Sequence, residues 1–173
     1  GGAIARSLPE DAVVSDDAVT AGLPIYTQTA GAARHDWLFL TGGAIGQGLP
    51  VAVGAAVARP GAKVVSINGD GAAAYTLQAL WTMVREGLDV TVVVVANRRY
   101  RILDIELQRT GAGRAGPAAR GLLDLGDPAM DWRALAAGFG MAADRCDTAE
   151  AFDAAFARAM AEPGPRLIEA MVR

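Results

Sequence analysis

The chain has 173 residues, 52% of them hydrophobic and 20% charged, with a formal net charge of -3. These values predict one domain with a substantial core, and they exclude a disordered chain and the basic surface of a nucleic-acid-binding domain. The single cysteine, Cys146, and the single histidine, His35, exclude a disulfide scaffold and a structural zinc site.

Apolar runs alternate with helical patterns along the whole chain. In chain order, the patterns predict strands at residues 12–14 and 37–40, a helix at 45–58, a strand at 63–67, a helix at 76–86, a strand at 89–96, a helix at 100–108, a loop at 111–127, helices at 131–137 and 148–161, and a strand at 165–172. Five valines in the run 89–96 are typical of a central parallel strand. We therefore expect a single α/β domain over residues 1–173, with α/β/α layers and a mainly parallel sheet.

The sequence pattern predicts neither a membrane-spanning helix nor a signal peptide. The most apolar run, residues 90–96, falls far short of the ~20 residues that a membrane-spanning helix needs. The first residues lack the basic segment and long apolar segment of a signal peptide. We expect a soluble, cytoplasmic protein with no membrane partner and no nucleic-acid partner.

Two polar segments follow neighbouring predicted strands. Gly69-Asp70-Gly71 comes after the strand 63–67, and Asn97 comes after the strand 89–96. Because parallel strands end at the same edge of a sheet, where ligands bind, Asp70 and Asn97 are expected to converge there. A carboxylate and an amide oxygen suit Mg²⁺, whose other ligands would come from water and phosphate oxygens. Gly71 would let backbone N–H groups approach those phosphates.

By itself, Gly69-Asp70-Gly71 is more typical of an ordinary strand-to-helix turn, because glycine and aspartate dominate turns for local reasons. Asn97, placed at the end of the next strand, favours the ligand site over the turn.

Another glycine-rich segment, residues 111–116, fits G-x-G-x-x-G by letter. It follows a helix rather than a strand, so we interpret it as a mobile loop over the site.

These residues resemble the C-terminal, diphosphate-binding domain of the thiamine diphosphate-dependent 2-oxo acid enzymes. That family includes acetolactate synthase, benzoylformate decarboxylase and pyruvate decarboxylase, and its motif is GDG, a helix and a strand, then two asparagines. The likeness spans nearly the whole chain and is greatest at residues 42–50 and 76–81, where acetolactate synthase large subunit-like and benzoylformate decarboxylase-like chains are most similar. It implies the thiamine diphosphate-binding fold.

The resemblance also implies roles for individual residues. Asp70 and Asn97 would bind Mg²⁺ through their side chains, and Arg99 through its backbone carbonyl. Gly71 and Ala72 would contact the diphosphate of thiamine diphosphate through their N–H groups. Ile45 would support the bent cofactor as an aliphatic prop, and the backbone carbonyl of Gly43 would meet its aminopyrimidine. Thr20 would be a hydroxyl donor, and Gly69 and Tyr100 would lie beside the phosphates.

Two departures from the family motif stand in this chain. Ala96 occupies the place of the first asparagine, while the ligand asparagine, Asn97, is retained. Arg98 stands where the family has glycine or another small residue, and we expect Arg98 and Arg99 to face solvent rather than the diphosphate.

The resemblance implies that the cofactor lies between this domain and a pyrimidine-binding domain, from the same or another chain, which carries the activating glutamate. No segment resembles that domain, so we expect no catalytic residue here. The six glutamates are predicted to be surface or helix-face acids: Glu10, Glu86, Glu106, Glu150, Glu162 and Glu169. The chain would thus be a fragment or subunit of a larger, homo-oligomeric enzyme.

The implied reaction is decarboxylation of a 2-oxo acid, ending in an aldehyde or in condensation with a second carbonyl, with the cofactor acting as electron sink. One alternative is a degenerate, non-catalytic cofactor-binding module of the same fold. Another is an unrelated flavodoxin-like or Rossmann-like nucleotide binder, which the lack of GxGxxG after the first strand weakens.

Among other residues, His35 is interpreted as a loop histidine rather than a proton relay, Cys146 as an inert thiol, and Trp81 and Trp132 as packing residues.

Overall fold

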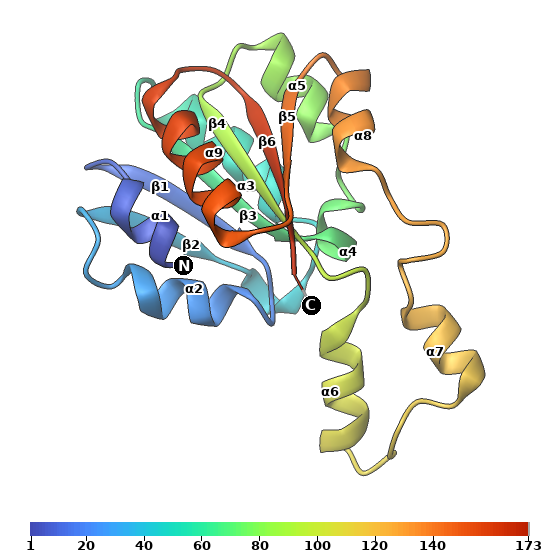
Figure 1. Ribbon diagram of the computed structural model, residues 1–173. Helices are drawn as coiled ribbons and strands as arrows, with labels where there is room; N and C mark the ends of the chain where they lie inside the picture. Colours follow the sequence, from blue (N-terminus) through green and yellow to red (C-terminus); the bar gives the residue numbers. More distant parts are fainter. Residues whose placement is uncertain (173) are drawn as a thin grey trace.

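Six parallel strands form one sheet in the order β2-β1-β3-β4-β6-β5. The computed structural model, which describes residues 1–172, shows this sheet between two layers of helices (Figure 1). The strands are β1 (Ala12–Asp17), β2 (His35–Phe39), β3 (Val64–Gly69), β4 (Val90–Ala96), β5 (Ala142–Cys146) and β6 (Arg166–Met171). The predicted three-layer α/β/α fold is confirmed, and the sheet is parallel throughout.

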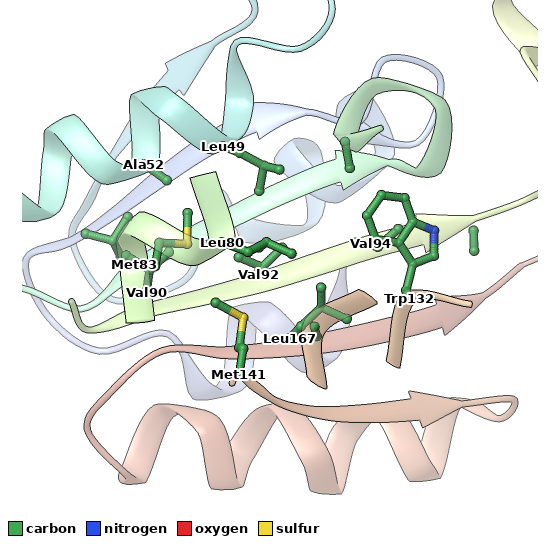
Figure 2. Packing of buried hydrophobic residues seen from close by; sticks show 14 of the residues in the cluster. Leu49, Ala52, Leu80, Met83, Val90, Val92, Val94, Trp132, Met141 and Leu167 are labelled. Carbon is green, nitrogen blue, oxygen red and sulfur yellow. The ribbon is translucent and has the colours of Figure 1, made fainter. Parts of the chain in front are cut away.

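The helices divide between the two faces according to the buried residues that they contribute. One face is covered by α3 (Gly48–Ala58), α5 (Ala79–Arg85) and α8 (Trp132–Gly138), and Figure 2 shows their side chains packed on Val90, Val92 and Val94. The other face is covered by α1 (Gly2–Ser7), α2 (Gly22–Thr29) and α9 (Ala149–Ala161). Both faces of β4 are buried, as its run of valines predicts.

Three short helices lie near the carboxyl ends of the strands. They are a single turn, α4 (Asp70–Ala73), after β3, and α6 (Arg101–Arg109) and α7 (Pro117–Leu123) after β4. Both α6 and α7 extend away from the body of the molecule, beyond that edge of the sheet (Figure 1). The predicted loop 111–127 is therefore partly wrong, because Pro117 at the first helical position begins α7 within it.

Other differences from the predicted elements have local causes. Helix α3 begins at Gly48 rather than at residue 45, because Gly46 has a φ of 99°, outside the helical region. Strand β5 and helices α1 and α2 were not predicted, since each is short and its apolar pattern is weak. Trp81 is 49% exposed and stacks with Arg85 rather than packing in the core, whereas Trp132 is buried as predicted.

The burial of Cys146 and the position of His35 agree with the roles predicted for them from the sequence. Cys146 is buried, and burial raises the pKa of its thiol, as an inert cysteine requires. His35 begins β2, at the edge of the sheet opposite the strand ends that carry Asp70 and Asn97, and its ring nitrogen contacts the carbonyl of Ala33. Among residues 1–172, no helix combines the length and apolar character needed to cross a membrane.

Candidate functional site

The sheet changes direction between β1 and β3. From β1 the chain goes outward to β2, and from β3 it goes the opposite way to β4, so the helices that follow β1 and β3 lie on opposite faces. In open parallel sheets, such a switch point opens a crevice at the carboxyl ends of the two strands. A ligand site is therefore expected where β1, β3 and β4 end, and the predicted residues lie there.

A cleft at this edge brings together nine of the ten residues predicted to bind the cofactor. They come from the ends of three strands and from the turn before α3: Thr20, Ile45, Gly69, Asp70, Gly71, Ala72, Asn97, Arg99 and Tyr100. The tenth, Gly43, lies two residues from Ile45 but outside the cleft lining. The cavity volume is about 50 Å³. Ligand pockets usually measure ~300–1,000 Å³, so this cleft has room for only part of a ligand of that size.

Asp70 is the buried acid of the cleft, with 3% of its surface exposed. One carboxylate oxygen accepts a hydrogen bond from the N–H of Gly71 at 3.0 Å, and the other from the N–H of Arg98 at 2.7 Å. Burial raises the pKa of Asp70, while these N–H groups and the nearby charge of Arg98 act in the opposite direction. A buried carboxylate with only neutral N–H donors bonded to it retains lone pairs for a cation.

Asn97 and Arg99 supply the other predicted metal ligands, on the loop that follows β4. The side-chain oxygen of Asn97 accepts from the N–H of Arg99 at 3.0 Å, which closes a tight turn. Between them, Arg98 has a φ of 58°, in the left-handed region where glycine is favoured. Carboxylate, amide and carbonyl oxygens are the donors that Mg²⁺ prefers, so these residues fit that ion. Across residues 1–172, no group of three His, Cys, Asp or Glu side chains could hold a metal.

The ring of Tyr100 lies directly against Gly71. A Cβ atom added to Gly71 would overlap Cε1 of Tyr100 and come within 2.9 Å of its Cδ1. Burial raises the pKa of the Tyr100 hydroxyl, and the neighbouring Tyr75 adds to the effect. Gly71 is therefore required by an aromatic contact as well as by any approach to phosphates.

The loop after β1 forms the facing wall of the cleft. Asp16 accepts a hydrogen bond from the N–H of Ala18 at 2.9 Å and another from the ring of Trp37 at 3.3 Å. Val19 then has a φ of 49°, which is strained for a β-branched residue. Thr20, the predicted hydroxyl donor to the cofactor, follows it and lines the cleft. Such strain clusters at functional sites, where the surrounding structure maintains it.

The last residue of α7 and the segment after it support the loop carrying Asn97. Leu125 donates its N–H to the carbonyl of Arg98 at 2.8 Å, and Tyr100 donates to the carbonyl of Leu123 at 2.9 Å. The side chains of Arg98 and Arg99 are exposed, as predicted, and Arg99 pairs with Asp104. Sequence reasoning missed this support because residues 123–125 carry no regular pattern.

Two buried acids close to this edge were also missed. Glu169 was predicted at the surface, but it lies in β6 with 2% of its surface exposed, so that prediction is wrong. One of its oxygens has no hydrogen-bond partner within residues 1–172. Burial raises its pKa. Asp17, at the end of β1, is fully buried and contacts the turn before α3. The sequence signal for the burial of Asp17 was its position directly after an apolar run.

Comparison with known proteins gives a consistent result. Residues 26–170 match the family described as thiamine pyrophosphate enzyme, C-terminal TPP binding domain. An acetolactate synthase large subunit protein of Mycobacterium tuberculosis, IlvX, is 52% identical over 95% of this chain and 32% of its own length. Benzoylformate decarboxylase of Pseudomonas aeruginosa is 32% identical over 93% of this chain and 29% of its own length.

A solved structure shows the same fold. The thiamine diphosphate-dependent 4-hydroxybenzoylformate decarboxylase of Rhodococcus jostii RHA1 superposes with a TM-score of 0.88 at 29% identity, over 99% of this chain and 31% of that protein. The chain therefore spans about a third of the length of the proteins it matches.

Proposed function

Because this chain belongs to the thiamine pyrophosphate enzymes and corresponds to their C-terminal TPP-binding domain, we propose that it holds the diphosphate end of the cofactor through Mg²⁺. Asp70 and Asn97 would bind the ion through side-chain oxygens, and Arg99 through its carbonyl. Gly71 and Ala72 would offer N–H groups to the phosphates. The observation that carries the proposal is the convergence of nine predicted residues in one cleft around a buried carboxylate.

The small cleft and the length of the relatives support a larger enzyme. We infer that residues 1–173 form one domain of it, with a pyrimidine-binding domain from the same or another chain completing the site in a homo-oligomer. The substrate would be a 2-oxo acid. When bound, thiamine diphosphate supplies the nucleophilic carbon and the electron sink for its decarboxylation. This chain's residues would bind and orient the cofactor and exclude water from one side of it.

Calorimetric titration of thiamine diphosphate into the chain tests the metal site. We expect binding in Mg²⁺, none in EDTA, and affinity at least about tenfold lower in Asp70→Asn, because a charge-assisted ligand is lost. Asp36→Asn is the control, since Asp36 is exposed on β2 and pairs with Arg59 away from the cleft. Equal binding in EDTA, or undiminished binding by Asp70→Asn, would contradict the proposal.

Turnover by the full-length protein separates a working enzyme from a degenerate binding module. Release of carbon dioxide from a 2-oxo acid, dependent on thiamine diphosphate, is the expected result. Cofactor binding without any turnover would favour the non-catalytic module. Family membership excludes the third alternative, an unrelated flavodoxin-like or Rossmann-like nucleotide binder.

A further inference from the structure

The turn between η1 (Thr41–Gly43) and α3 carries Ile45 into the cleft wall. Its backbone is unusual, with φ of 69° at Gly43 and 99° at Gly46. Such a glycine-rich turn has many accessible conformations, and ordering it has a large entropic cost. Within the turn, the only side chain that bonds to it is Gln47, which donates to the carbonyls of Thr41 and Ala44. The backbone of the turn adds hydrogen bonds from Ala44 to Thr41 and from Ile45 to Gly43, and further hydrogen bonds reach the turn from outside.

Asp17 provides that outside contact. Its Oδ2 accepts hydrogen bonds from the N–H groups of Gly46 and Gly48, at 2.8 and 3.0 Å. The turn is also held by its carbonyls. Thr76 donates to the carbonyl of Gly46 at 2.7 Å, and Ser15 donates to that of Gly48 at 2.9 Å. Gly46 is thus held from both sides, directly beside Ile45.

The arrangement around Asp17 lowers the stability of the folded chain, so stability does not explain it. Among the residues that the structure describes, the buried Oδ1 of Asp17 has no hydrogen-bond partner, and neither has the side-chain oxygen of Asn68, its register neighbour on β3. Burial raises the pKa of Asp17, and the adjacent charge of Asp16 adds to the effect. Buried acceptors without partners lower the stability of the folded chain, and such violations concentrate where function requires them. Gly48 fits so closely between the two side chains that a Cβ would lie 2.5 Å from that of Asp17.

We propose that Asp17 is a positioning residue for the cofactor. By holding the N–H groups of Gly46 and Gly48, it sets the conformation in which Gly43 and Ile45 face the thiazolium and pyrimidine end. Asp17 itself does not line the cleft, so it acts through the turn. This inference rests on the proposed function, in which Asp70 and Asn97 hold the diphosphate end separately.

The test compares two ligands in Mg²⁺. Thiamine diphosphate reaches both the metal loop and the turn, whereas inorganic pyrophosphate reaches only the metal loop. In Asp17→Asn, we expect about a tenfold weaker affinity for thiamine diphosphate with an unchanged affinity for pyrophosphate, because the amide oxygen accepts the bonds from Gly46 and Gly48 without the charge that strengthens them. Amide hydrogen exchange gives a second readout. It should accelerate at least about tenfold at Gly46 and Gly48, while the valines of β4 keep their protection.

Glu169→Gln is the matched control, because it also neutralises a buried carboxylate of the sheet, but in β6, which β3 and β4 separate from β1. It should change neither the ratio of affinities nor exchange at Gly46. If Asp17→Asn fails to fold, Thr76→Val removes the half-buried hydroxyl on the opposite side of the turn and should shift both readouts in the same direction.

The outcomes separate the two proposals. If the native chain binds neither ligand, the proposed function fails and the positioning role fails with it. If the native chain binds both, and the folded variants keep the native ratio of affinities, only the positioning role of Asp17 is overturned. A loss of affinity for both ligands in equal measure would also overturn it, because that result indicates general destabilisation of the edge.

Discussion

The carboxylate of Asp70 accepts a 2.7 Å hydrogen bond from the N–H of Arg98, which lies 28 residues further along the chain. This bond ties the start of α4 to the loop after β4, so two of the proposed metal-binding segments are joined before any ion is present. A preorganised site of this kind loses less conformational entropy when it binds its ligand. It also explains why Arg98 adopts a left-handed backbone, since its N–H must reach Asp70.

The left-handed backbone of Arg98 should favour glycine over a β-branched residue at this position. Arg98→Gly should leave the free energy of unfolding unchanged or raise it by up to about 1 kcal/mol, because glycine relieves the strain of φ 58° and retains the N–H donor. Arg98→Val should lower it by about 1–3 kcal/mol, since a β-branched residue is poorly suited to this region. Urea denaturation measures both. The opposite order of the two variants would show that the Arg98 side chain, not its backbone, matters.

Gly71 and Tyr100 should be energetically coupled. Gly71→Ala is expected to destabilise the chain by about 1–3 kcal/mol, because the new methyl group overlaps the tyrosine ring. In a Tyr100→Ala background, the same change should cost less than about 0.5 kcal/mol. A double-mutant cycle in thermal or urea denaturation gives the coupling energy. Strictly additive effects would mean that Gly71 is required for another reason.

The sequence predicted the central sheet and most of the cleft because both depend on local patterns. The valines of β4 indicate a buried strand, and the placement of Asp70 and Asn97 after successive strands predicts their shared edge. What was missed depends on contacts between distant segments. Glu169 sits in an apolar strand whose pattern does not reveal that its carboxylate lies inside. Similarly, the bonds of Asp17 to Gly46 and Gly48 span about thirty residues of chain.

The buried position of Glu169 carries a stability prediction. One of its oxygens has no hydrogen-bond partner in the part of the chain that the structure describes, and burial raises the pKa of Glu169, so its charged form is disfavoured inside the protein. Glu169→Gln should therefore raise the free energy of unfolding at pH 7 by about 1 kcal/mol. Chemical denaturation of the native chain and the variant measures this difference. A clear loss of stability would instead indicate that the charge of Glu169 is compensated, Arg145 on β5 being its register neighbour.

The titration of Asp70 leads to a prediction about pH. Burial raises its pKa in the folded chain above the ordinary value of 3.8, so the folded state binds this proton more tightly than the unfolded state does. Its contribution to stability is full below the ordinary pKa and is lost as pH rises through the folded pKa. Asp16, Asp17 and Glu169, whose pKa values burial also raises, act in the same direction.

To isolate Asp70, the free energy of unfolding of the native chain is compared with that of Asp70→Asn between about pH 4 and pH 7. The difference, native minus variant, should fall as pH rises in the absence of ligand. With Mg²⁺ and thiamine diphosphate the trend should reverse, because the ion binds the charged carboxylate and stabilises the form that burial disfavours. A difference that stays flat in both conditions would mean that Asp70 does not exchange its proton for the metal ion.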